Sequence, residues 1–364
     1  MTIEQELRDQ VRDILIKLVT ISSPTGAVEA FQKHLAESLE HYHLQGGKDK
    51  HDNLVYRTPD FNAKKSLLLT SHLDTVNPGE NIKPIVAGDW IRTDGTTILG
   101  ADPKAGIAAV LTMLEYFKRK NKVLKNMEFI FSTNEEEGDH TLKYARIASK
   151  KAIVLDNGAP ISDVEYCWPA AQVFLIEVRG KKEIHAQLDC ARGRNAIVAL
   201  ATIIQEIPWG AYANGCVSNT GTISGGKSTT IIPDYACLKG NVYCFKQKDL
   251  VSFMEKVKTA CAKADKAFKT KTTIKITERY RETRTNLKSP FIAELKEAYD
   301  KNGVNIQFME RLLVNCNNCL KPDIQSVNVG LGHKDIHTVR ERQSVSQLAR
   351  FTKILIDLAE KNYI

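Results

Sequence analysis

Acidic and histidine side chains follow an apolar segment early in the sequence, in a pattern that suits metal binding. The segment "SLLLTSHLDTV" (66–76) is typical of a buried β-strand up to Thr70 and then places His72 and Asp74 at its end. Residues two apart on a strand point to the same side, so both can face one ligand while Leu73 returns to the core. In metal sites such a carboxylate fixes the tautomer of a ligating imidazole. This spacing suits one edge of a metal centre, but the chain repeats it at His333 and Asp335, so the rest of the sequence must decide.

Four further segments place carboxylate or imidazole groups where a strand is expected to end or a helix to begin. They are "GADPKAG" with Asp102, "TNEEEG" with Glu135, Glu136 and Glu137, "VLDNG" with Asp156, and "VGLGHKDIH" with His337. Each segment taken alone also fits a structural role. Asp102 before Pro103 is typical of a helix N-cap followed by a first-turn proline, for example. A chemical role is indicated by the whole set and not by any single member.

The set matches what a two-metal hydrolase requires. Two ions about 3.5 to 4 Å apart need a bridging carboxylate, terminal ligands on each side, and one carboxylate left unbound as a base. Three ligating carboxylates and two neutral imidazoles from this set bring three negative charges to four positive ones. The surplus positive charge favours a bridging hydroxide over water as the nucleophile of a hydrolysis.

The order of the expected elements indicates an α/β domain around these residues. Helices expected near 3–19 and 27–42 precede apolar strands near 53–57, 66–71 and 152–156, and a further helix is expected just after the first aspartate of "GADPKAG". In α/β domains of this kind, functional sites gather at the carboxyl ends of the strands. The candidate residues lie at those ends.

A second domain is expected as an insertion in the first. From about residue 171, strands and two long helices follow one another as in a small α+β domain of about 110 residues, which is a common domain size. The expected boundaries are 1–169 for the first part of the catalytic domain, 170–284 for the inserted domain and 285–364 for the second part.

Composition argues against membrane and nucleic-acid partners. No apolar run approaches the roughly 20 residues that span a bilayer, and the charged start is typical of an amphipathic helix and not of a signal peptide. The formal charge of +8 comes from 51 lysine and arginine residues dispersed among 43 acidic ones. The densest basic stretch, 262–285, suits the solvated surface of a helix and a strand. We therefore expect a cytoplasmic protein.

The eight cysteines are expected to be free thiols, mostly buried, as in other cytoplasmic chains of this size. The pair in "CNNC" (316–319) has the spacing of a zinc or redox site. It lacks a second pair and a preceding thioredoxin-like strand, so we expect neither role for it.

The chain resembles the peptidase T, carboxypeptidase G and aminoacylase family of co-catalytic zinc exopeptidases and deacylases. The resemblance covers nearly the whole chain, and the peptidase T members are the most similar. It rests on segments in a fixed order: "SHLDTV", "GADPKAG", "TNEEEG", "VLDNG", "HA", "GRNAI", "GGKSTTIIP" and a late "IH". It implies an α/β/α zinc-exopeptidase catalytic domain and an inserted α+β, ferredoxin-like domain that serves as a lid or in dimerisation.

The resemblance also implies roles for individual residues. The implied zinc ligands are His72 and Asp156 for one ion, Glu136 and His337 for the other, and Asp102 as the bridge. Cobalt or manganese would also suit this set. The implied assisting residues are Glu135 as general base, Asp74 as the partner of the first histidine, and His185, which would hold the substrate's carbonyl oxygen, often across a dimer.

Three positions depart from the family pattern, all of them expected to bind substrate. Thr230 stands where asparagine is expected, Asn315 where aspartate is expected, and Tyr243 where an arginine usually binds the substrate's carboxylate. A phenol cannot reproduce the bidentate grip of arginine on a carboxylate. Either the substrate differs from a typical tripeptide or its binding is weaker.

A further departure concerns the residue after the bridging aspartate. The family often has a cis peptide bond at this point, and here the next residue is Pro103. A cis bond costs about 2.5 to 4 kcal/mol before most residues but only about 0.5 to 1 kcal/mol before proline. We predict that the bond between Asp102 and Pro103 is cis.

Three functions are open from the sequence. The leading one is a cytoplasmic di-zinc aminopeptidase on short peptides, similar to a tripeptidase and possible as a homodimer. A deacylase or amidohydrolase acting on N-acyl amino acids would use the same site, and the choice of a free-amine or N-acyl substrate would separate the two. A family member that binds metal or a partner but hydrolyses weakly is favoured by the altered substrate positions and opposed by the intact Glu135.

Overall fold

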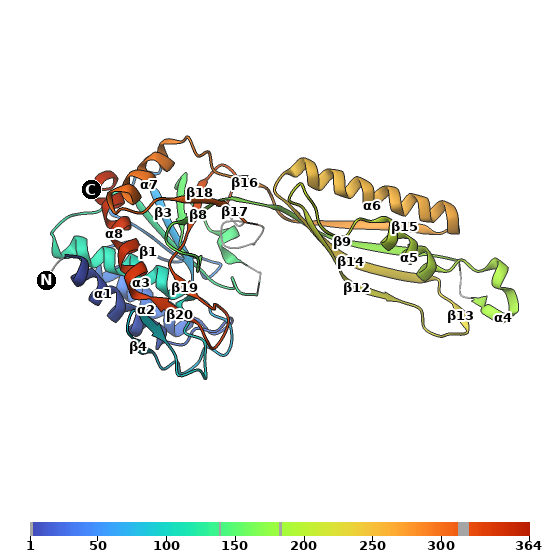
Figure 1. The fold of residues 1–364 in the computed structure, drawn as a ribbon, viewed down its shortest axis with the longest axis horizontal. Helices are drawn as coiled ribbons and strands as arrows, with labels where there is room; N and C mark the ends of the chain where they lie inside the picture. The colour runs from blue at the N-terminus through green and yellow to red at the C-terminus, as the bar shows by residue number, and fades with distance from the viewer. Residues whose placement is uncertain (1–2, 138–139, 182–183, 312–319) are drawn as a thin grey trace. The chain divides into compact units, whose positions relative to one another are not determined.

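The computed structural model describes residues 3–137, 140–181, 184–311 and 320–364. The chain forms two compact units, Met1–Cys167 with Arg284–Ile364 and Trp168–Thr283 (Figure 1). The first unit carries both ends of the chain, and the second is inserted in it. Within the described part of the chain, no helix is both long and apolar enough to cross a bilayer.

Unit 1 is built on a mixed β-sheet with helices. Its helices are α1 (Ile3–Val19), α2 (Glu29–His41), α3 (Ala101–Arg119), α7 (Pro290–Lys301), α8 (Val345–Asn362) and the 3-10 helix η1 (Thr141–Tyr144). The sheet holds β1 (Gln45–Lys48), β2 (Leu54–Arg57), β3 (Leu67–His72), β6 (Met127–Ser132), β7 (Lys151–Val154), β8 (Asp163–Trp168), β16 (Thr283–Arg284), β17 (Gln307–Glu310) and β18 (Gln325–Val329). The α/β class expected from the sequence is confirmed.

The centre of this sheet consists of four parallel strands. In the order β1-β2-β6-β3-β7-β18-β8-β16, strands β6, β3, β7 and β18 run parallel, while β2 and β8 are antiparallel to their central neighbours. Leu69 of β3 lies between Phe129 of β6 and Ile153 of β7. The carboxyl ends of the four parallel strands therefore meet at one edge, where the segments after each strand converge.

Alternation along β3 divides the apolar side chains between the two faces of the sheet. Leu67 and Leu69 belong to the main core, to which α1, α3, α7 and α8 contribute, whereas Leu68 belongs to a smaller cluster on the other face. Leu73 is buried in the main core, as expected from its place between two polar neighbours. Pairing with β6 and β7 on both sides fixes the register of β3 and with it the place of its last residues.

A small antiparallel sheet in unit 1 carries the last candidate ligand. Its order is β19-β20-β5-β4, and its strands are β4 (Ile85–Ala87), β5 (Trp90–Arg92), β19 (His333–Lys334) and β20 (Arg342–Ser344). The turn between β19 and β20 contains His337, whose φ of 61° is left-handed. Such a conformation is uncommon outside glycine and concentrates at functional sites.

The start of α3 places Asp102 beside the carboxyl edge of the central strands. Asp102 has non-helical φ and ψ of −81° and 107°, so the regular helix continues from Pro103. Gly100 precedes Ala101 as the N-cap of α3 and is left-handed, with φ 69°. The Asp102–Pro103 peptide bond is cis, as predicted.

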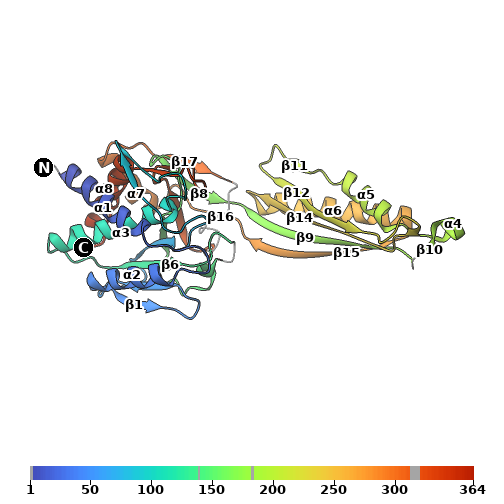
Figure 2. The same ribbon diagram turned by 90° about the horizontal axis from the view of Figure 1, so that it is seen from below.

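Unit 2 is an antiparallel sheet with two long helices. Its main elements are β9 (Ala170–Arg179), α5 (Ala196–Glu206), β12 (Val217–Gly225), β14 (Tyr235–Cys244), α6 (Gln247–Phe268) and β15 (Lys271–Tyr280). Its short elements are β10 (Ile184–His185), α4 (Ala186–Asp189), η2 (Cys190–Arg192), β11 (Gly210–Ala211) and β13 (Ile231–Ile232). The strands lie side by side in the order β11-β12-β14-β9-β15 (Figure 2). The β-α-β-β-α-β succession is ferredoxin-like.

The expectation that all cysteines are free is wrong for one pair. Cys216 and Cys244 form a disulfide. The ladder of β12 and β14 pairs Val217 with Tyr243, so the two cysteines come opposite each other with their Cα atoms 4.2 Å apart. That proximity follows from strand register, which the spacing of cysteines in the sequence does not reveal. The "CNNC" pair lies outside the described residues.

Packing of α3 against β7 offers a test of how the fold positions Asp102. A Cβ atom at Gly106 would lie 2.6 Å from Cβ and 2.7 Å from the carbonyl oxygen of Leu155. Overpacking of this kind costs about 1 to 3 kcal/mol, against the roughly 1 kcal/mol by which alanine favours a helix over glycine. We expect Gly106→Ala to lower the free energy of unfolding in urea. Gly47→Ala is the control, because nothing lies within 4 Å of its added Cβ, and an equal effect of both changes would contradict this account.

Candidate metal centre

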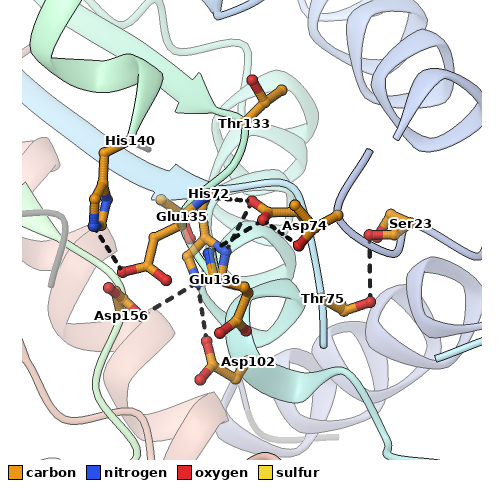
Figure 3. A network of polar contacts seen from close by, with 12 residues as sticks. Ser23, His72, Asp74, Thr75, Asp102, Thr133, Glu135, Glu136, His140 and Asp156 are labelled. Carbon is orange, nitrogen blue, oxygen red and sulfur yellow. Dashed lines mark hydrogen bonds and ion pairs between the residues drawn. The ribbon is translucent and has the colours of Figure 1, made fainter. Parts of the chain in front are cut away.

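Seven of the predicted site residues lie together where the central strands end, and Figure 3 labels all of them except His337. His72 closes β3 and Asp74 follows it, the glutamates follow β6, and Asp156 follows β7. His337 reaches the same place from the turn after β19. Segments distant in the sequence meet there because the four strands run parallel and share one carboxyl edge.

Asp102 lies between the two histidines. Its Oδ1 is 3.1 Å from Nε2 of His72, and its Oδ2 is 3.4 Å from Nε2 of His337. Beyond the histidines, Nε2 of His72 is 3.4 Å from Oδ1 of Asp156, and Nε2 of His337 is 3.1 Å from Oε2 of Glu136. Each carboxylate oxygen of Asp102 therefore faces a separate group of possible ligands, which is the arrangement of a bridging carboxylate.

The donor atoms fit metal ions. In each of the two groups, His72 with Asp102 and Asp156, and Asp102 with Glu136 and His337, the ligand atoms all lie within 4.8 Å of one another. Among the described residues, the buried Oε1 of Glu136 and Oδ2 of Asp156 have no hydrogen-bond partner. Buried charged oxygens are costly unless they are paired or coordinate a metal, and two divalent cations would supply the missing partners.

The pKa values of the cluster also indicate a place that favours positive charge. Burial would raise the pKa of Asp102, but contacts with His337 and His72 lower it well below its usual range. Contacts with Asp102 and Glu136 raise the pKa of His337 to about 10. Burial lowers the pKa of His72, yet hydrogen-bonding contacts with three carboxylates raise it well above its ordinary value. In the metal-free protein the neighbouring carboxylates therefore favour the protonated form of both imidazoles.

Glu135 stands next to these groups and differs from them in its environment. Burial raises its pKa to about 9, and the neighbouring charges of Asp156, Asp102 and Glu136 act in the same direction, against His72. This carboxylate is the one predicted to remain unbound as a base. A cavity of about 520 Å³, lined by Asp102, Glu135 and Asp156 among others, opens beside it. That volume is within the range of small-molecule sites.

Asp74 contacts more of the site than the one histidine that it was expected to orient. Its carboxylate accepts the backbone N–H of Glu135 at 3.1 Å and of Glu136 at 3.2 Å, and the hydroxyl of Thr25 at 2.8 Å. The distance to Nδ1 of His72 is 3.5 Å, long for a hydrogen bond. Burial raises the pKa of Asp74, but these contacts lower it below its usual value. This buried carboxylate thus fixes the acidic loop and lies beside the first ligand.

Glu341 fixes the other side of the centre and was not predicted. It is buried, and it accepts the backbone N–H groups of Leu99 and Gly100 at 2.8 Å each and of Asp102 at 3.0 Å. Burial raises its pKa to about 7. The segment "RERQ" looks like ordinary surface charge, so nothing local in the sequence indicates this role.

Two more contacts were missed for the same reason. His140, 3% exposed, places Nε2 3.7 Å from Oε1 of Glu135, and burial lowers its pKa to about 4. Thr25 reaches Asp74 from the segment before α2. Thr25 is distant in sequence from the segments that indicate chemistry. His140 is close to one of them but carries no pattern of its own.

Three further positions singled out in the sequence belong to unit 2. His185 is in unit 2, where its Nδ1 accepts the backbone N–H of Gln187 at 3.4 Å. Thr230, whose hydroxyl lies 3.0 Å from that of Ser228, and Tyr243 of β14 also belong to unit 2. Asn315 lies outside the described residues.

Proton release on metal binding tests the charge state of the two histidines. Metal binding requires neutral imidazoles, whereas the raised pKa values keep His72 and His337 protonated at pH 7. We expect zinc binding to release protons and the apparent affinity to rise with pH up to about 10. Titration calorimetry at pH 7 in two buffers of different ionisation enthalpy measures the release. Identical heats in the two buffers would contradict the assignment.

Replacement of Asp74 tests its hold on the ligands. Asp74→Asn keeps one side-chain oxygen and turns the other acceptor into an NH2 group, so one of the two backbone amides loses its acceptor, and loss of such an outer-shell partner lowers metal affinity roughly 10- to 100-fold. Thr25→Val should have a smaller effect in the same direction. Affinity is measured by competition with a chelator, and Asp60→Asn on the exposed surface is the control. Unchanged affinity in Asp74→Asn would show that this carboxylate does not position the ligands.

Comparison with known proteins agrees with this geometry. Residues 68–361 match the model of peptidase family M20/M25/M40. The uncharacterized protein YqjE of Bacillus subtilis (strain 168) is 25% identical over 313 residues, 85% of this chain and 84% of that protein. Peptidase T of Geobacillus kaustophilus (strain HTA426) is 31% identical over 121 residues, 32% of this chain and 29% of that protein.

A solved structure extends the likeness to the whole chain. The crystal structure of aminopeptidase PepT from Bacillus cereus ATCC 10987 has 25% sequence identity and a TM-score of 0.88, and the match covers 97% of this chain and 98% of that one. Since the family model spans most of the sequence, this chain belongs to peptidase family M20/M25/M40 and is a metallopeptidase.

Proposed function

We propose that the protein is an aminopeptidase of short peptides, similar to a tripeptidase, with two zinc ions at the cluster around Asp102. The observation that carries the proposal is the position of Asp102, with one oxygen directed to each histidine. The names of the peptidase T relatives and of the aminopeptidase PepT structure support the substrate class. Nitrogen and oxygen ligands suit zinc, and cobalt or manganese would also fit.

The proposed ligands divide between two positions. His72 and Asp156 would hold one ion, Glu136 and His337 the other, and Asp102 would contact both. Bound there, divalent ions polarise a peptide carbonyl and lower the pKa of a water molecule. The His337 side chain is 47% exposed, so the second position lies nearer to solvent and gives a substrate access.

Glu135 would act as the general base. It accepts a proton from the attacking water and returns it to the amine that leaves. It must be ionised to do so, and in the metal-free protein burial and three neighbouring carboxylates oppose ionisation. Neutralisation of those carboxylates by bound cations removes part of that opposition. Asp74 holds the backbone of Glu135 in place through its amide.

Unit 2 would complete the enzyme. We propose that it serves as a lid or in dimerisation, that His185 holds the substrate's carbonyl oxygen, and that the enzyme works in the cytoplasm. A second candidate is hydrolysis of N-acyl amino acids by the same metal site. Tyr243 in place of the expected arginine does not separate the two, because both substrates carry a carboxylate.

Removal of the base and removal of the metal together test the proposal. A panel of di- and tripeptides and N-acyl amino acids is assayed with wild type, chelated protein and Glu135→Gln, and metal content is measured in each. We expect cleavage of peptides with a free amine, loss of it on chelation, and a decrease of kcat by about 10² to 10⁴ in Glu135→Gln with the metal retained. Peptide cleavage that survives chelation and the substitution would refute the mechanism, and cleavage of N-acyl substrates alone would favour the deacylase.

A further inference from the structure

The outer face of the small sheet in unit 1 carries a row of cations. Lys334 of β19 lies directly opposite Arg342 of β20, and Arg342 lies directly opposite Arg92 of β5. All three side chains are exposed, while the next row on the opposite face is buried. We call these three residues the cationic row.

Such a row is unfavourable without a partner. Like charges placed directly opposite each other on neighbouring strands are destabilising. Unit 1 contains 33 basic and 33 acidic residues, so the row is a local concentration and not the consequence of a positively charged domain. Its arrangement calls for a compensating group.

The described residues supply that compensation only in part. The ring of Trp90 lies 5.0 Å from the guanidinium of Arg342 and 5.6 Å from Nζ of Lys334, and Asp335 lies 3.5 Å from Arg342. Arg92 donates to the carbonyl oxygen of Thr93 in its own turn, at 2.9 Å. An aromatic face and one carboxylate orient the cations but leave the row with a positive excess.

A cavity opens against the row. It has a volume of about 520 Å³, and Arg340 adds another cation to its lining. The residues around it are Arg92, Thr93, Asp94, Gly95, Asp335, Val339, Arg340 and Arg342. Its lining therefore holds three guanidinium groups and two carboxylates, an excess of one positive charge. The volume suits a small ligand.

We propose that this cavity is a binding site for an oxyanion, a carboxylate or a phosphate, held by Arg92, Arg340 and Arg342. Guanidinium groups bind both anions in a bidentate manner, and a bound anion would neutralise the excess charge of the row. Aromatic contact with Trp90 holds Arg342 in place, which reduces the entropy lost on binding.

The oxyanion site is connected to the metal centre through one turn. Asp335 lines this cavity and also the cavity that contains Asp102 and Glu135. The same turn carries His337. The oxyanion therefore has two alternative sources. The first is the carboxylate end of a substrate held at the metal centre, and this alternative rests on the proposed function. The second is a free anion that acts on the turn.

Calorimetric titration with inorganic phosphate tests the site directly, on the metal-loaded protein. We expect one phosphate to bind per chain in wild type, and at least tenfold weaker binding in Arg92→Gln/Arg342→Gln. Lys64→Gln/Lys65→Gln removes the same charge from an exposed loop and should bind as wild type does. Arg340→Gln, outside the sheet, should also weaken binding, and it replaces the double variant if that one unfolds. Equal phosphate binding in wild type and the arginine variants, or none in any, would overturn the proposal.

Peptide kinetics separate the two sources of the anion. If the ligand is a substrate carboxylate, phosphate competes with peptide, and the arginine variants raise KM about tenfold for a free-acid tripeptide but not for its amide. If it is a free anion, the ratio of the two KM values is unchanged and phosphate alters kcat without competition. Either result supports an oxyanion site. Absence of peptidase activity would count against the proposed function alone, because the calorimetric result stands without it.

Discussion

The structure depends on one buried carboxylate, Asp102, shared between two imidazoles. Its oxygens face His72 on one side and His337 on the other, at 3.1 and 3.4 Å. A buried carboxylate cluster of this density is unfavourable unless cations neutralise it, because the low dielectric of the interior strengthens repulsion between like charges. The protonated histidines meet this requirement in the metal-free protein, and two metal ions would meet it more completely. Ligand geometry, proton release and the behaviour of the base all follow from this need for positive charge.

The fold meets that requirement through parallel strands and two supporting carboxylates. Strands β6, β3, β7 and β18 end at one edge, and Glu341 contacts Leu99, 242 residues away in the sequence, beside that edge. Asp74 and Glu341 then accept backbone N–H groups from the segments on either side of the cluster. Polar networks of this kind restrain geometry only when all their members are satisfied. The two carboxylates leave the metal ligands free and satisfy the loops that carry them.

Much of the candidate site could be predicted from the sequence, because its residues lie in segments with a local spacing pattern or a fixed order along the chain. His72 and Asp74 were indicated by period-two spacing at the end of an apolar strand, and the cis bond at Pro103 by the low cost of that isomer before proline. The features that the sequence did not reveal depend on contacts between distant parts of the chain or lack a local pattern. The disulfide of Cys216 depends on strand register. Strand β12, "VSNTGTISG", lacks the apolar alternation of a strand because most of its residues are exposed. Thr25 and Glu341 contact the site from segments without any chemical motif.

Anomalous diffraction from crystals of the zinc-loaded protein tests the central claim most directly. The account predicts two peaks about 3.5 to 4 Å apart, both within zinc–oxygen bonding distance of about 2.0 to 2.2 Å from Asp102, one next to His72 and the other next to His337. A single ion, or a pair of ions of which neither contacts Asp102, would contradict it.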